Sequence, residues 1–256
     1  MARNYIVRPV EKAIQVLRCI SAAPSAMTLK EVSSRVGLPK TTVFRYLHTL
    51  RACGLVAYDA ERSLYRVDSG ILSLAPRSGE LHRLREIAVP YMQALQRRWD
   101  ETINLGVVEG TNIVYVEIFE SQRALRMQAR VGRRDPIHTT AIGKAILAHL
   151  PQELARQILP PRLRKRTART ISSAATLARE LALARRNGYA SEESENEEGA
   201  SCIGAPIFDE SNAVVAGLSI SAPAARLTGA MRQKMAPALI DAARRISTTL
   251  GFRSTR

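Results

Sequence analysis

The chain has 256 residues, of which 46% are hydrophobic, and a formal net charge of +15 at pH 7. This length is enough for a sizeable core and about two domains. No apolar run approaches the roughly 20 residues that a membrane span needs, and no signal-peptide pattern opens the chain. The charge indicates a polyanionic partner. DNA fits better than a membrane surface because the basic residues are spread through folded segments.

The cysteines and histidines predict neither a disulfide framework nor a metal site. Cys19, Cys53 and Cys202 are far apart and odd in number, and the 4 histidines lack metal-ligand spacing. We therefore expect a protein of the reducing cytoplasm, without a structural metal or a cofactor.

The N-terminal region predicts a loose arm followed by a helix. Residues 1–9 form the arm, where Arg3 and Arg8 either touch DNA or belong to a frayed terminus. The helix is expected over residues 10–21, and its apolar stripe should pack under the two helices that follow. The residues of this stripe are Val10, Ala13, Ile14, Leu17 and Ile20.

Residues 28–51, TLKEVSSRVGLPKTTVFRYLHTLR, predict two short helices joined by a tight turn. Thr28 and Glu31 form a capping-box pattern at the start of the first helix. Gly37 supplies the turn, and Pro39 suits the first position of the second helix. The second helix has an apolar face and an opposite face of basic and hydroxyl residues. This arrangement is typical of a helix-turn-helix, whose second helix enters the DNA major groove.

A β-hairpin is predicted directly after the second helix, with strands at 55–58 and 64–67. A hairpin in this position is the wing of a winged helix-turn-helix. Arg62 lies at its tip, where it either reaches DNA or remains a solvated turn residue. The predicted DNA contacts are Arg45 and Thr41 to base edges, Lys40 and Thr42 to phosphate, Arg62 to a phosphate or the minor groove, and Thr28 and His48 without an assigned target.

Residues 69–99 predict a helical connector with a break or kink at Pro76 and at Pro90. Its apolar stripe is compatible with a dimer contact or with packing on a second domain. From residue 100 the pattern changes to strands with intervening helices, which predicts an α+β module with a mainly antiparallel sheet. The expected boundaries are 1–68 for the DNA-binding domain, 69–99 for the connector and 100–256 for the second domain.

The second domain is expected to contain five strands and four helices. The strands are predicted at 102–109, 112–120, 125–131, 202–208 and 213–221, and the helices at 141–149, 152–158, 174–187 and 228–250. The strand at 125–131 rests on a strict alternation of apolar and polar residues. Two charged segments, the basic 162–169 and the glutamate-rich 191–198, are each expected to be solvated loops.

Several separate motifs occur along the chain in a fixed order. They are VGLPKTTVFRYLHTLRACGLV followed by YRV, then ETINLGVVEG, VGRRDPIHTTAIGKAILAHLP and NGYASEESENEEGASCIGAPIFDESNAVVAGLSISAP. In these motifs the chain resembles the IclR family of bacterial transcriptional regulators. Its LRMQARVGRRDP segment is similar to the KdgR-type branch, which regulates sugar-acid and pectin-product catabolism. The resemblance implies a winged helix-turn-helix, a linker helix, a GAF-like effector-binding domain, and a homodimer or homotetramer.

The resemblance also implies that the second domain binds a small organic acid. The backbone N–H groups at the start of the helix predicted near Ala141 suit a carboxylate, and Ser219 and Ser221 point to one face of a strand. Glu192 stands where many members have aspartate, which leaves the ligand open. The effector-binding residues implied by the resemblance are Asp135, Ala141, Ile142, Glu192, Cys202, Ser219 and Ser221. The neighbouring arginines, which either help to recruit an anion or, for the most part, lie on the outer face, are Arg126, Arg130, Arg133 and Arg134.

We therefore predict a transcriptional regulator that binds double-stranded operator DNA and responds to a small carboxylic acid. The expected form is a repressor of a catabolic operon relieved by a sugar acid. Two alternatives are an activator responding to an aromatic or other carboxylic acid, and a DNA-binding scaffold whose second domain only oligomerises. An enzyme is not expected, because no nucleophile elbow, phosphate loop or zinc motif is present and nothing orients His138 toward Cys202.

Overall fold

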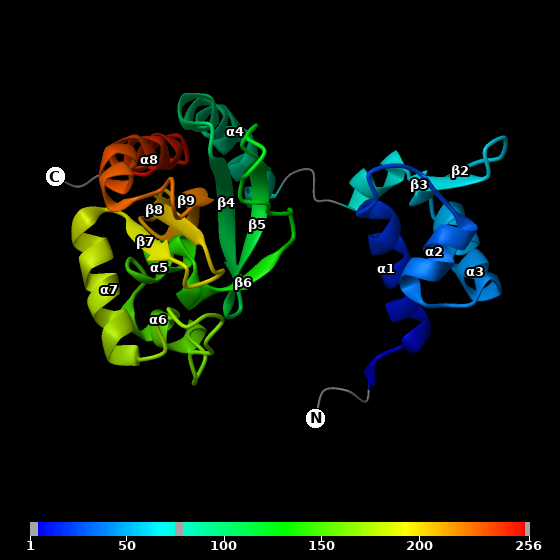
Figure 1. Ribbon diagram of the computed structural model, residues 1–256, viewed down its shortest axis with the longest axis horizontal. Coiled ribbons are helices and arrows are strands. Elements are labelled where there is room, and N and C mark those ends of the chain that lie inside the picture. The colour runs from blue at the N-terminus through cyan, green and yellow to red at the C-terminus, as the bar shows by residue number, and fades with distance from the viewer. Residues whose placement is uncertain (1–4, 75–78, 254–256) are drawn as a thin grey trace. The chain divides into compact units, whose positions relative to one another are not determined.

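The computed structural model describes residues 5–74 and 79–253, and the chain divides into two compact units, Met1–Gly79 and Glu80–Arg256. Each unit has its own hydrophobic core (Figure 1). The arm residue Arg3 and the break expected at Pro76 lie outside the described residues.

The first unit combines a helical core with a small antiparallel sheet. Its helices are α1 (Arg8–Ser21), α2 (Leu29–Val36), α3 (Lys40–Ala52) and the short 3₁₀ helix η2 (Ser69–Leu74). Its strands are β1 (Met27–Thr28), β2 (Val56–Asp59) and β3 (Leu64–Val67), in the order β1-β3-β2. The helix-turn-helix and its hairpin wing are therefore confirmed.

The first helix differs from its prediction in where it starts and in what it buries. α1 starts at Arg8, inside the segment expected to be a loose arm. Its fully buried residue is Val16, which the predicted stripe omitted, and Ile20 is buried beside it. Val10 and Ile14 are 55% and 45% exposed. The prediction that the whole stripe packs inward is wrong, because the helix pair covers only the C-terminal half of α1.

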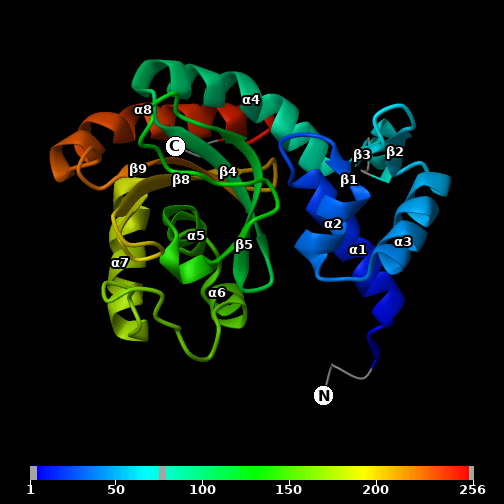
Figure 2. The ribbon, with the colours of Figure 1, turned by 45° about the vertical axis from the view of Figure 1, so that its right-hand side comes forward.

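In the second unit, six strands form an antiparallel sheet with helices on both faces (Figure 2). The strands are β4 (Thr102–Glu109), β5 (Asn112–Phe119), β6 (Arg134–Pro136), β7 (Ala190–Glu193), β8 (Ala200–Phe208) and β9 (Val214–Pro223), in the order β6-β5-β4-β9-β8-β7. One face is covered by α4 (Glu80–Trp99) and α8 (Gly229–Thr249), and the other by η3 (Ile137–Thr139), α5 (Ala141–Leu147), α6 (Gln152–Ile158) and α7 (Ala174–Asn187). The α+β class is confirmed.

The connector helix α4 packs on its own unit. Leu84, Ala88, Met92 and Leu95 join a core formed with α8 and the sheet. The apolar stripe of α4 is therefore already covered, and of its two expected uses the packing on the second domain is the one observed. α4 continues through Pro90 without ending there.

Residues 125–131 do not form a strand, so that prediction is wrong. The chain there makes isolated contacts instead: the Met127 carbonyl accepts a hydrogen bond from Thr102 Oγ1 at 2.8 Å. Leu125 and Val131, two of the alternating apolar residues, are both exposed. A strand needs a neighbouring edge as well as an alternating pattern, and β6 pairs with β5 in its place.

Helix α5 lies close to the sheet because the strands beneath it carry glycine. A Cβ atom on Gly204 of β8 would lie 2.6 Å from the Ala141 carbonyl carbon. One on Gly217 of β9 would lie 2.8 Å from Ile142 Cγ2. Since atoms do not approach so closely without displacement, any larger residue would push α5 away from the sheet.

We predict that Gly204→Ala lowers the free energy of unfolding of the second unit by about 1–3 kcal/mol, because the new methyl group overlaps backbone atoms of α5. The matched control is Gly229→Ala at the start of α8, where a Cβ would meet only Arg232 Nη2 at 3.9 Å, an ordinary van der Waals contact, and should leave stability unchanged or raise it by about 0.5 kcal/mol. Urea unfolding followed by Trp99 fluorescence measures both, and equal stabilities of the two variants would contradict the prediction.

Candidate functional site

The turn between α2 and α3 fixes the direction of the exposed face of α3. Thr28 caps α2, since its backbone N–H donates to Glu31 Oε2 at 2.7 Å and its Oγ1 accepts from the Glu31 N–H at 3.3 Å. Gly37 ends α2 in the left-handed region with φ of 66°. Pro39 is the N-cap of α3 rather than its first helical residue. The predicted capping box and turn are confirmed.

Helix α3 has a buried side and an exposed side. Val43, Leu47 and Leu50 lie in the core of the first unit. Thr42 is partly buried, so a phosphate contact from its hydroxyl is less accessible than the others. The remaining predicted DNA-contacting residues of this helix are all exposed, and they are Lys40, Thr41, Arg45 and His48.

The two other predicted DNA-contacting residues lie outside α3. Arg62 is exposed at the tip of the β2–β3 hairpin, where its backbone N–H donates to Asp59 Oδ1 at 3.1 Å. The Thr28 hydroxyl donates to Glu31 Oε2 at 2.9 Å, so it already has a structural contact. The wing therefore presents an arginine, and Thr28 orders the start of α2.

A small polar cavity lies in the second unit on the sheet face that α5 covers. Ile103, Ile203 and Ile220 point into the core with α8, so their neighbours along β4, β8 and β9 point to the opposite face. The cavity has a volume of about 40 Å³. It is lined by Thr102, Asn104, Tyr115, Met127, Gln128, Ala129, Arg133, Asp135, Glu192, Asn196, Glu197, Ala200, Cys202 and Ser221.

The structure brings four of the predicted effector-binding residues together around this cavity. These are Asp135, Glu192, Cys202 and Ser221. Ser219 is not among the lining residues, but it is linked to them by hydrogen bonds. Asn104 Nδ2 donates to Ser219 Oγ at 3.2 Å and to Ser221 Oγ at 3.0 Å. Asn104 therefore joins the two serine hydroxyls into one polar cluster.

Ala141 and Ile142 are not among the residues that line the cavity. Both are buried at the start of α5, where they pack on Gly204 and Gly217 of the sheet. Thr140 caps this helix by accepting a hydrogen bond from the Gly143 N–H at 2.9 Å. The effector contact expected of Ala141 and Ile142 stays a prediction from the family resemblance.

Glu192 is a buried carboxyl group that faces a thiol. Its side chain belongs to a residue only 2% exposed, and the β7–β8 register sets it opposite Cys202. Burial raises the pKa of Glu192 to about 7, and hydrogen bonds from Cys202 and from the Glu195 N–H offset this only in part. Burial, and then the charge of Glu192, raise the pKa of Cys202 well above its usual range. Cys202 is therefore a neutral thiol and a poor nucleophile.

Of the two charged segments expected to be solvated loops, 162–169 is a mostly exposed loop as predicted, whereas 191–198 contains the end of β7 and two buried glutamates. Glu195 is buried, and Lys144 Nζ lies 2.6 Å from its Oε1. Arg166, from the basic 162–169 segment, places Nη1 3.3 Å from Asp135 Oδ1. The prediction for 191–198 is wrong because Lys144, far away in the sequence, pairs with Glu195 and compensates the burial of its charge.

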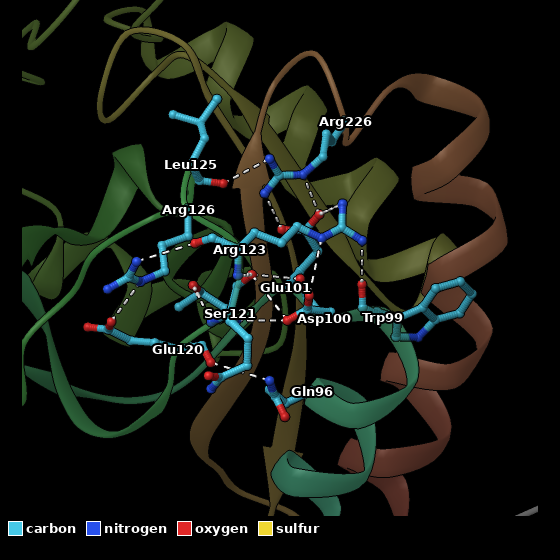
Figure 3. Close-up of polar contacts among 12 residues, drawn as sticks. Gln96, Trp99, Asp100, Glu101, Glu120, Ser121, Arg123, Leu125, Arg126 and Arg226 are labelled. Carbon is cyan, nitrogen blue, oxygen red and sulfur yellow. Dashed lines mark hydrogen bonds and ion pairs between the residues drawn. The ribbon is translucent and has the colours of Figure 1, made fainter.

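Arg123 and Arg226 anchor the beginning of the segment 121–133 (Figure 3). This segment covers the cavity, because its residues from Met127 to Arg133 contribute to the lining. Arg226 donates to both carboxylate oxygens of the buried Glu101, at 2.7 and 2.8 Å. Its Nη1 also donates to the Leu125 carbonyl at 2.9 Å. Arg123 Nη1 lies 3.5 Å from Glu101 Oε1. One buried carboxylate thus organises the two arginines that anchor the cover.

Arg133 holds the other end of this cover. Its Nε lies 3.0 Å from Asp135 Oδ2, and its Nη2 lies 3.4 Å from Glu197 Oε2. The expectation that it sits on the outer face is wrong, because it lines the cavity. Burial, and then the nearby Asp135, raise the pKa of Tyr115 well above its usual range, so this phenol is a neutral hydrogen-bonding group.

Sequence reasoning missed several lining residues, and Asn104 is the most informative of them. Period-two alternation within 102–109 sets Thr102 and Asn104 on one face of a strand. What the pattern lacks is the strand order: only the pairing of β4 with β9 brings Asn104 beside Ser219.

The described residues do not form a cysteine–histidine catalytic pair, a metal site or a membrane-spanning helix. His138 Nε2 lies 3.2 Å from the Arg164 carbonyl oxygen, while Cys202 faces Glu192, so no nucleophile–base pair joins them. Within 5–74 and 79–253, no cluster of His, Cys, Asp and Glu is suited to a metal ion. The same ranges contain no helix with the length and apolarity to cross a membrane.

Comparison with known proteins identifies both units. The family model described as the IclR helix-turn-helix domain matches residues 9–60, and that described as the bacterial transcriptional regulator IclR C-terminal matches residues 80–248. The HTH-type transcriptional regulator KdgR of Escherichia coli K12 is 39% identical over 225 residues, covering 88% of this chain and 86% of that protein. The transcriptional repressor AllR of the same strain is 30% identical over 246 residues, covering 96% and 91%.

A solved structure supports the same assignment. An IclR homologue from Microbacterium hydrocarbonoxydans, complexed with 4-hydroxybenzoate, superposes with a TM-score of 0.76 at 28% sequence identity. The match covers 94% of this chain and 98% of that one.

We predict that Glu192→Gln becomes more stable relative to the wild type as the pH rises. The folded-state pKa of about 7 exceeds the ordinary value of 4.5, so the folded wild type binds this proton more tightly than the unfolded chain. Its stability should therefore fall between about pH 4.5 and 7 and then level off, whereas glutamine does not ionise. Urea unfolding at pH 5, 6, 7 and 8 measures the difference.

The adjacent Glu193→Gln is the matched control for this test. Hydrogen bonds from Arg169 and Arg232 lower the pKa of Glu193, so its difference from the wild type should be flat from pH 5 to 8. A flat difference for Glu192→Gln as well would contradict the assignment.

Proposed function

The chain belongs to the IclR family of bacterial transcriptional regulators, and we propose that it is a repressor of a catabolic operon whose hold on operator DNA is relieved by a small carboxylic acid. The observation that carries this proposal is the combination of two features in one chain. The first unit exposes a basic helix-turn-helix face, and the second encloses a polar cavity lined by buried carboxyl and hydroxyl groups. The names of the relatives, a regulator and a repressor, support the direction of control.

The exposed face of α3 supports binding in the major groove. Arg45 and Thr41 suit base edges, because a guanidinium group pairs with guanine and a hydroxyl group with several bases. Lys40, at the helix start, suits a phosphate, and Arg62 on the wing suits a phosphate or the minor groove. The net charge of +15 adds a sequence-independent attraction to DNA.

A homodimer is supported by the exposed apolar side of α1 and the residues just before it. Ile6, Val7, Val10 and Ile14 are all exposed, although each is an aliphatic residue. A contiguous apolar surface on one protomer is typical of a protein–protein contact. Two copies joined there would present two α3 helices to a two-fold related operator. Further association into a tetramer remains part of the same proposal.

The cavity supports a small hydroxylated acid as the effector. Asn104, Ser221 and Ser219 offer a cluster of hydrogen-bonding groups, and Arg133 offers a cation beside Asp135. The volume of about 40 Å³ is far below the roughly 300 Å³ of a typical ligand pocket. Binding therefore requires the cover formed by residues 121–133 to move outward. The 4-hydroxybenzoate bound by one structural relative supports a carboxylic acid as the ligand class.

We predict that Arg45→Ala weakens operator binding by about 1–3 kcal/mol and relaxes specificity at one base pair, because a bidentate contact to guanine is lost. Mobility-shift titration of duplexes selected by the wild-type protein from a random-sequence pool measures this. Lys40→Ala should instead weaken binding to all sequences alike and reduce the salt dependence.

Arg186→Ala, an exposed arginine on α7 of the other unit, is the matched control and should bind as the wild type does. The proposed base readout would be rejected by an Arg45→Ala protein that retains wild-type affinity and sequence preference.

A further inference from the structure

Phe44 is an exposed aromatic side chain at the edge of the polar face of α3. The residue is 50% exposed, whereas phenylalanine is usually buried. The neighbouring Val43 and, one turn later, Leu47 are fully buried in the core of the unit. Phe44 therefore lies beside the buried face of the helix, about 100° around the axis from Val43, and the packing of the unit leaves half of its surface uncovered.

The neighbours of Phe44 on the helix surface are polar. Thr41 lies one turn before it, and Arg45 follows directly; both are exposed. His48 lies one turn after it, and the centroids of the two rings are 6.2 Å apart at an interplanar angle of 40°. The imidazole lies beside the phenyl ring, and half of the residue surface of Phe44 remains open.

The open half of Phe44 matches one feature of the DNA major groove. Thymine presents an apolar 5-methyl group there, and apolar side chains including phenylalanine recognise it by contact. A phenyl ring has neither a hydrogen-bond donor nor a positive charge, so it does not stabilise a contact with a phosphate or a sugar oxygen. The surface around Phe44 is also basic and hydroxyl-rich, which favours a nucleic acid over an apolar protein partner.

We propose that Phe44 reads a thymine in each operator half-site by packing its ring against the 5-methyl group. The inference rests on the proposed function, since it requires α3 to enter the major groove. Because Phe44 and Arg45 are adjacent on the helix, this thymine lies close to the guanine that Arg45 contacts. Phe44 is then a specificity-determining residue that the sequence pattern of basic and hydroxyl groups did not indicate.

Replacing single thymines by deoxyuridine tests this directly, because the exchange removes the methyl group and leaves every hydrogen-bonding group in place. The probes are duplexes that the wild-type protein enriches from a random-sequence pool. We expect one thymine per half-site at which the exchange weakens wild-type binding about fourfold in fluorescence anisotropy, as the loss of one buried methyl group implies. Phe44→Ala should lose the sensitivity at that thymine alone, and Phe44→Leu should retain most of it.

Leu154→Ala, an exposed apolar residue of α6 in the other unit, is the matched control and should keep the wild-type pattern. Unchanged sensitivity at other thymines shows that Phe44→Ala is still folded and bound in register. A Phe44→Ala protein with the full wild-type pattern, or one changed only in oligomeric state, would overturn the inference. Failure of the wild type to enrich any sequence would overturn the proposed function itself.

Discussion

The close contact of α5 with the glycines of β8 and β9 is the constraint on which the second unit depends. A side chain at Gly204 or Gly217 would occupy the space taken by the backbone of α5 or by Ile142. The same contact carries Lys144 of α5 into the interior, where it pairs with Glu195. The sheet face beside the helix is left with short polar side chains, and these enclose the cavity. The packing of one helix thus determines the site.

The three buried carboxyl groups near this helix differ in how their charge is balanced. Asp135 has two arginines, and Glu195 has a lysine. Glu192 has only a thiol and a backbone N–H, and burial raises its pKa to about 7. A buried carboxyl group with such a raised pKa lowers the stability of the fold, because its charged form is poorly solvated. Groups of this kind concentrate at functional sites. This favours Glu192 as the residue that senses the effector.

Local patterns in the sequence were sufficient for the helix-turn-helix, the wing and most elements of the second unit. The capping box at Thr28 and the glycine after α2 depend only on neighbouring residues, and both are observed. The predictions that are wrong concern contacts between residues far apart in the sequence. The alternating segment 125–131 finds no strand edge, and the glutamate-rich segment 191–198 is partly buried because Lys144 pairs with Glu195. Of the 14 residues that line the cavity, four were predicted as effector-binding, because others such as Asn104 reach it only through the strand order of the sheet.

In this account, an acid bound in the cavity of the second unit changes the affinity of the first unit for operator DNA. This effect is tested most directly by the operator affinity of the full chain, measured by fluorescence anisotropy with and without a sugar acid that raises its melting temperature. We expect that acid to weaken operator binding by about 5-fold to 150-fold, the usual range of allosteric coupling, and Ser221→Ala to reduce the effect. An acid that binds the second unit in the cavity yet leaves operator affinity unchanged would contradict the account.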